Sequence, residues 1–183
     1  MNCNLPFDVI VDGEKHNIRN RCDYRVILDI IEILNDADLT NVEKIQTSIF
    51  VFYEEPDKIE NVVVAFEELL KVLNLGEDND GNNLEKPIMD WQHDFPQIAP
   101  AVSRVLGYSV RNPENYTHWY DFCGAYMEIG GDCTFANIVS LRSKMRKGKK
   151  LDECELEFYR KNKKIIDLPQ HLTQDEKEWL EED

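Results

Sequence analysis

The chain has 183 residues and a net charge of −15 at pH 7, with 21 basic and 36 acidic side chains. An apolar content of 42% is enough for a hydrophobic core in one domain, or in one domain with a small appendage. The acidic balance argues against a nucleic-acid partner. The five cysteines form no Cys-x-x-Cys pair, and no apolar run approaches the ~20 residues of a membrane span. We therefore expect a reduced, cytoplasmic protein without a membrane partner.

A β-hairpin is predicted at the start of the chain. Phe7, Val9 and Val11 alternate with other residues, which is typical of a strand with one buried face. Asp12-Gly13 is a favoured two-residue hairpin turn because both residues tolerate positive φ. Two strands alone are barely stable, so the hairpin must pack on something else.

Three helices are predicted after the hairpin, and with it they make up residues 1–75. Asp23 suits the N-cap of the first helix, and Thr40 with Glu43 forms a capping box for the second. The third is expected to begin near Pro56, with Phe66 in the middle of a long apolar stripe. This spacing predicts that Phe66 is a core residue.

The rest of the chain is expected to be helical as well. Residues 76–88 are an acidic linker rich in turn residues, and 89–166 form a second helical segment, in the same compact domain or as a subdomain. Residues 167–183 are an acidic tail, with a short helix that contains Trp179. The predicted fold is mainly α, with about six to eight helices and an N-terminal β-hairpin.

Charge is unevenly distributed along the chain. Residues 138–164, the basic segment, carry ten basic and four acidic side chains, and Lys147, Lys149 and Lys150 surround its one glycine. The simplest interpretation is a solvated helix face that pairs with neighbouring acids. The alternative is a docking site for an acidic protein partner, which we favour over a nucleic-acid site.

Two pairs of His and Asp side chains raise the alternative of a metal-dependent hydrolase. His93 and Asp94 are adjacent, and His118 is followed by Asp121. Two histidines and two aspartates could hold one metal ion. However, Asp94 is well placed to cap the helix after it, and His118 lies among aromatic residues, as hydrogen-bonded core histidines do. The chain also lacks nucleotide-binding and nucleophile motifs. We therefore expect no enzyme activity, no metal and no cofactor.

Four stretches of the sequence resemble the bacteriophage "gene product fifteen" family of Gram-positive siphophages and prophages over about residues 5–166. They are "LPFDVIVDGEKHNIRNRCDYR", "DWQHDFPQIAPAVSRVLGYSVR", "HWYDFCGAY" and "FANIVSLRSKMRKGKKLDECELEFY". Members are usually encoded just before the tape measure protein. The resemblance implies a non-enzymatic tail assembly chaperone that keeps the tape measure protein soluble in the host cytoplasm and is absent from the mature virion.

Further partners follow from the same resemblance. The tail tube protein, a second tail chaperone and other copies of this chain are candidates beside the tape measure protein. The alternative role is that of a minor virion protein, such as a tail-completion or head–tail connector protein.

The resemblance also gives candidate partner-binding residues, which form a structural or partner-binding cluster. They are Asp90, Trp91, Asp94, His118, Trp119 and Phe122. We expect the two helices that carry them to pack together, with Trp91 and Trp119 as anchors. His118 is expected to donate a hydrogen bond to a carboxylate or a carbonyl. Lys147, Lys149 and Lys150 complete the candidate set.

Overall fold

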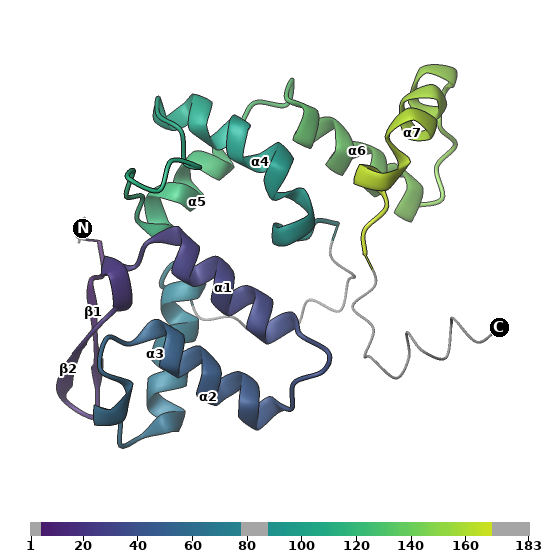
Figure 1. Cartoon of the computed structure of the whole chain (residues 1–183). Helices are drawn as coiled ribbons and strands as arrows, with labels where there is room; N and C mark the ends of the chain where they lie inside the picture. Colours follow the sequence, from purple (N-terminus) through teal and green to yellow (C-terminus); the bar gives the residue numbers. More distant parts are fainter. Residues whose placement is uncertain (1–4, 78–87, 170–183) are drawn as a thin grey trace. The chain divides into compact units, whose positions relative to one another are not determined.

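The structure is a computed structural model that describes residues 5–77 and 88–169. These residues form seven α-helices and a two-stranded antiparallel hairpin, so the predicted mainly α fold class is confirmed (Figure 1). They divide into two compact units, one of residues 5–77 and 117–122 and the other of 88–116 and 123–169. No helix in these ranges is long and apolar enough to cross a membrane. The predicted helix around Trp179 lies outside the described residues.

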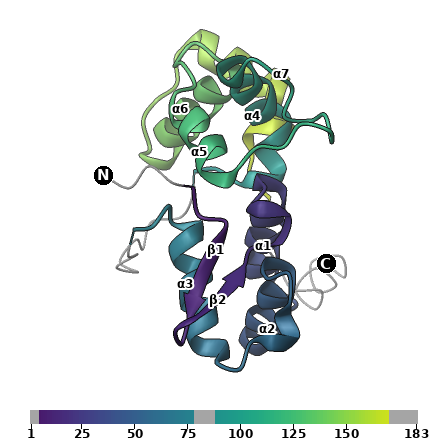
Figure 2. The same cartoon turned by 90° about the vertical axis from the view of Figure 1, so that its left-hand side faces the viewer.

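The N-terminal hairpin is present in the first unit, beside helix α3 (Figure 2). It consists of strands β1 (Asp8–Val11) and β2 (Glu14–Asn17). Val11 pairs with Glu14, so Asp12 and Gly13 form a two-residue turn, with φ angles of 50° and 87°. Positive φ at both positions matches the right-handed twist of the strands. Val9 and Val11 are buried, which gives the hairpin the packing that two strands need.

Two helices of the first unit begin at the predicted capping residues. The unit contains α1 (Tyr24–Asn35), α2 (Asn41–Phe52) and α3 (Val62–Leu73). The Asp23 side chain accepts the Arg25 N–H at 3.0 Å. Thr40 and Glu43 make both hydrogen bonds of the capping box. Both caps are confirmed, because their chemistry needs only neighbouring residues.

The prediction for the third helix was wrong in two respects. Pro56 starts a short 3-10 turn, and α3 begins only at Val62, where the Asn61 side chain accepts the Val64 N–H at 3.3 Å. Phe66 is half-buried, because the core face of α3 runs through Ala65, Leu69 and Val72 at i, i+4 and i+7. The apolar residues of α3 therefore cover a wider part of the helix surface than the face that is buried in the core.

The second unit is built from the later helices. They are α4 (Trp91–Leu106), the later part of α5 (Trp119–Met127), α6 (Thr134–Arg146) and α7 (Glu153–Ile166). Helix α4 contains two prolines, and Pro100 has no N–H for the carbonyl of Pro96. The Arg111 guanidinium donates to that carbonyl at 2.9 Å. Helices α6 and α7 share a small core of Ile138, Leu141 and Ile166.

Candidate partner-binding site

The motif residues divide into two sets, one in each unit. The α4 set, in the second unit, contains Asp90, Trp91 and Asp94. The α5 set, in the first unit, contains His118, Trp119 and Phe122. The two sets have different surroundings, so each is built up separately from its own contacts.

Asp90, rather than Asp94, caps a helix in the α4 set. The Asp90 side chain accepts the His93 N–H at 2.7 Å and is the N-cap of α4. Asp94 lies in the first turn of that helix, where it accepts the Asp90 N–H at 3.0 Å. The prediction that Asp94 caps the helix after it was therefore wrong. An acid in the first turn is still favourable, because it faces unpaired N–H groups at the positive end of the helix dipole.

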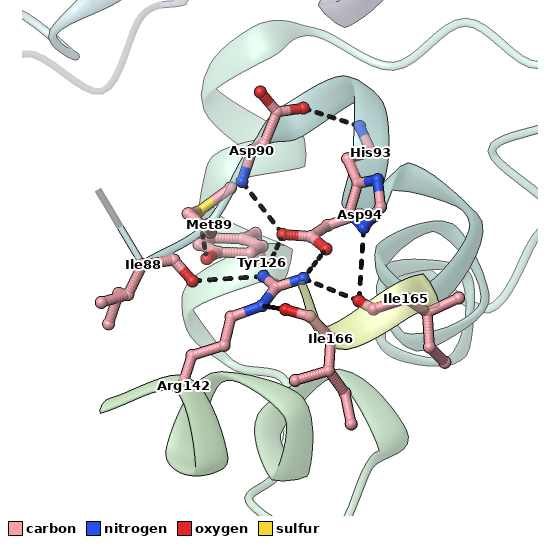
Figure 3. A network of polar contacts seen from close by, with 9 residues as sticks. All are labelled: Ile88, Met89, Asp90, His93, Asp94, Tyr126, Arg142, Ile165 and Ile166. Atoms are coloured by element: carbon pink, nitrogen blue, oxygen red, sulfur yellow. Dashed lines mark hydrogen bonds and ion pairs between the residues drawn. The ribbon is translucent and has the colours of Figure 1, made fainter. Parts of the chain in front are cut away.

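Asp94 forms a buried ion pair with Arg142 of α6 (Figure 3). The guanidinium donates hydrogen bonds to both carboxylate oxygens, at 2.7 and 2.8 Å, and both side chains are almost completely buried. The remaining N–H groups donate to the carbonyls of Ile88, Ile165 and Ile166, at 3.2, 2.8 and 2.6 Å. Such bidentate geometry suits the planar arginine head. Arg142 thus ties the start of α4 and the end of α7 to α6.

Trp91 contacts the later part of α5 within the second unit, whereas Trp119, the other predicted anchor, belongs to the first unit. The Trp91 ring lies 4.9 Å from that of Tyr126, centroid to centroid. The Tyr126 hydroxyl donates to Sδ of Met89 at 3.0 Å (Figure 3). Burial, with a smaller effect of Asp94, raises the pKa of Tyr126. Trp91 itself is half-buried, so it keeps some contact with solvent.

The α5 set is buried, and its polar atoms find partners in the first unit. Nε2 of His118 lies 3.0 Å from the Pro6 carbonyl, and Nδ1 accepts the Tyr120 N–H at 3.0 Å. Since a carbonyl can only accept, Nε2 carries the proton, and the predicted donation to a carbonyl is confirmed. The Trp119 indole N–H donates to the Leu73 carbonyl at 3.0 Å.

Contacts with the start of α1 hold the α5 set in the core. The Phe122 ring stacks on the Tyr24 ring, with centroids 4.3 Å apart and planes within 5°. Beside this stack, Asp23 accepts the Thr117 N–H at 3.2 Å, and the Tyr24 N–H donates to the Thr117 carbonyl at 2.9 Å. These contacts explain why residues 117–122 belong to the first unit.

The burial of His118 makes the stability of the first unit depend on pH. Burial lowers the pKa of His118, against smaller raising effects of the Pro6 hydrogen bond and Asp121. Below the unfolded-state pKa of about 6.5, the unfolded chain takes up a proton that the folded protein does not. The stability that comes from keeping His118 neutral in the folded protein is therefore fully present above the unfolded-state pKa. It is lost as the pH falls toward the lowered pKa of His118 in the folded protein. His118→Gln should lose less stability than the unmodified protein between pH 7 and pH 5 in urea unfolding. Equal losses would contradict this.

The four residues considered for a metal site are divided between the units. His93 and Asp94 belong to the second unit, and His118 and Asp121 to the first. The Asp94 carboxylate is taken by Arg142, and Nε2 of His93 lies 3.3 Å from the Ile165 carbonyl. Within residues 5–77 and 88–169, no three His, Cys, Asp or Glu side chains are grouped to hold a metal ion. Asp94, His93 and His118, three of the four residues considered, therefore have partners within the protein.

The basic segment divides into buried, paired and exposed side chains. Arg142 is buried, whereas Lys144 pairs with Glu155 across to α7. The candidates Lys147, Lys149 and Lys150 are exposed around Gly148, just after α6. Sequence reasoning missed the role of Arg142. The available signal was its position four residues after Ile138 and seven after Phe135, on the buried stripe of the helix.

A comparison with models of protein families places this chain. The family model described as Bacteriophage Gp15 protein matches residues 1–168, which include both sets of motif residues and the basic segment. No curated protein and no solved structure matches the chain. The chain therefore belongs to the Bacteriophage Gp15 protein family, as its sequence motifs predicted.

Proposed function

We propose that this protein is a tail assembly chaperone that binds the tape measure protein in the host cytoplasm. It keeps that long helical protein soluble while the tail tube assembles, and it leaves before the virion matures. The observation that carries the proposal is membership in the Bacteriophage Gp15 protein family over residues 1–168. The order of genes that the family resemblance implies links such proteins to the tape measure protein.

Surface charge and exposed apolar side chains are consistent with this role. A net charge of −15 favours solubility of the protein and of a complex that contains it. In the first unit, several large apolar side chains are exposed, and they are Ile10, Val42, Phe50, Val62 and Val63. Apolar surface of this kind can bind the apolar face of an amphipathic helix.

The buried motif residues stabilise the two units rather than contact a partner. Asp94, His118, Trp119 and Phe122 are buried and make contacts within their own units. Their substitution is expected to unfold a unit before it reveals a binding role. Among the candidate residues, Lys147, Lys149 and Lys150 are exposed side chains that a partner can reach.

Charge reversal at these three lysines tests whether they bind an acidic stretch of the tape measure protein. Lys147→Glu, Lys149→Glu and Lys150→Glu together should weaken binding by about tenfold or more, because like charges then face each other. Added salt should weaken the unmodified complex as well. Binding of a tape measure fragment can be measured by titration calorimetry at two salt concentrations.

A second triple variant separates local from overall charge. Lys15→Glu, Lys44→Glu and Lys58→Glu change the net charge by the same amount in the first unit. This control should weaken binding less than the reversal at Lys147, Lys149 and Lys150, because it leaves those three lysines in place. If both triple variants bind equally well, the exposed lysines are only a solvated face. If the protein is present in purified phage particles, the role of a minor virion protein becomes the better explanation.

A further inference from the structure

The second unit contains an open apolar groove with a volume of about 430 Å³. Tyr126 of α5 and Phe135 and Val139 of α6 line it, together with Ile88 before α4. Ser140 and Ser143 contribute small polar side chains on the same face of α6. The shape and lining suit one large apolar side chain.

Two basic residues lie next to the groove, at the C-terminal end of α6. Arg146 and Lys147 follow Ser143 by three and four residues, and they follow Val139 and Ser140 by seven. On an α-helix these spacings put residues on one face, so both basic residues extend the groove face by a turn. Both are exposed. The surface therefore fits a segment that has an apolar anchor and acidic neighbours.

The chain itself contains such a segment in residues 170–183. This stretch, "QHLTQDEKEWLEED", has six acidic residues and one lysine around Trp179 and Leu180. Tryptophan is a large, rigid anchor at low cost in side-chain entropy. The segment lies beyond residue 168, where the family match ends, so it is a feature of this chain outside the shared family region.

The chain leaves α7 close to the groove. Arg142 donates to the carbonyl of Ile166, the last residue of α7, at 2.6 Å (Figure 3). The same guanidinium donates at 3.2 Å to the carbonyl of Ile88, which lines the groove. Residues 167–178 separate Ile166 from Trp179, and these twelve residues can span up to about 40 Å. The linking chain is therefore long enough to bring Trp179 back to the groove.

We propose that residues 170–183 dock on the groove of their own chain, with Trp179 as the anchor in the apolar part. The acidic residues beside it then face Arg146 and Lys147. Docking covers apolar side chains of the second unit, and any protein partner that uses this groove must displace the segment. The proposal does not depend on the tape measure protein as partner.

Fluorine NMR on the full chain labelled with 5-fluorotryptophan tests this docking. The chain has three tryptophans, so the Trp179→Phe variant identifies the Trp179 resonance by its loss. In the unmodified protein, this resonance should differ from that of the labelled peptide 170–183, independently of protein concentration. Ser140→Glu places a negative charge on the groove edge and should move the resonance to the free-peptide position. Lys147→Glu should shift it in the same direction.

Asn137→Glu is the matched control, because Asn137 is an exposed residue of α6 that does not line the groove. It should leave the Trp179 resonance unchanged. A Trp91 resonance that differs from that of the urea-unfolded protein shows that the second unit of each variant is folded. A Trp179 resonance that coincides with the free peptide would overturn the proposal, as would one that Ser140→Glu and Lys147→Glu both leave in place. A shift that appears only at high protein concentration would place the segment on a second copy instead.

Discussion

Arg142→Ala is expected to lower the free energy of unfolding of the second unit by about 3–5 kcal/mol. The substitution leaves the Asp94 carboxylate buried without its counter-ion. It also removes the donors to three carbonyls, those of Ile88, Ile165 and Ile166. Buried polar atoms without partners carry their full desolvation cost. Urea unfolding, with hydrogen exchange to locate the loss in α4, α6 and α7, measures the effect.

Arg160→Ala is the matched control for this substitution. Arg160 lies on α7 in the same unit but is exposed, so its loss should cost about 0.5 kcal/mol or less. The double variant Asp94→Leu with Arg142→Met removes both charges and should recover part of the lost stability. A loss below about 1 kcal/mol in Arg142→Ala would show that the pair does not hold the three helices together.

Phe122→Ala is expected to lower the free energy of unfolding of the first unit by about 3–5 kcal/mol. The ring is fully buried, stacks on Tyr24 and lies 6.1 Å from the ring of Trp119, centroid to centroid. Its removal leaves a cavity that the stacked Tyr24 ring cannot fill without moving. Thermal and urea unfolding both measure the change.

Phe50→Ala provides the comparison in the same unit. Phe50 is 64% exposed, and the Arg19 guanidinium lies 5.9 Å from its ring centroid. Its loss should cost about 1 kcal/mol or less. If the two variants lose equal stability, Phe122 is not the core residue that its burial indicates.

Local chemistry made much of the first unit predictable from the sequence. The Asp12-Gly13 turn and the caps at Asp23 and Thr40 depend on residues within a few positions of each other. Such turns and caps can be predicted without knowledge of the fold. The apolar stripe of α3 was a weaker guide, because it does not tell which part of a wide apolar face packs, and Phe66 was misplaced for that reason.

Long-range contacts were not predictable in the same way. Asp94 and Arg142 are 48 positions apart, and charge density alone cannot separate a buried arginine from the exposed lysines that follow it. Residues 117–122 join the first unit through contacts to Cys22, Asp23 and Tyr24, about 95 positions earlier. The motif pattern marked these residues as important, but only the fold shows that they belong to two separate sets.

We propose above that this protein keeps the tape measure protein soluble, and co-expression tests that role. The most direct measurement is the soluble fraction of the tape measure protein from the same phage, expressed alone and together with the full chain. We expect the tape measure protein to precipitate alone, to remain soluble in co-expression and to co-purify with the chain as a complex. A tape measure protein that precipitates equally in both cases, with no co-purified complex, would contradict the chaperone function.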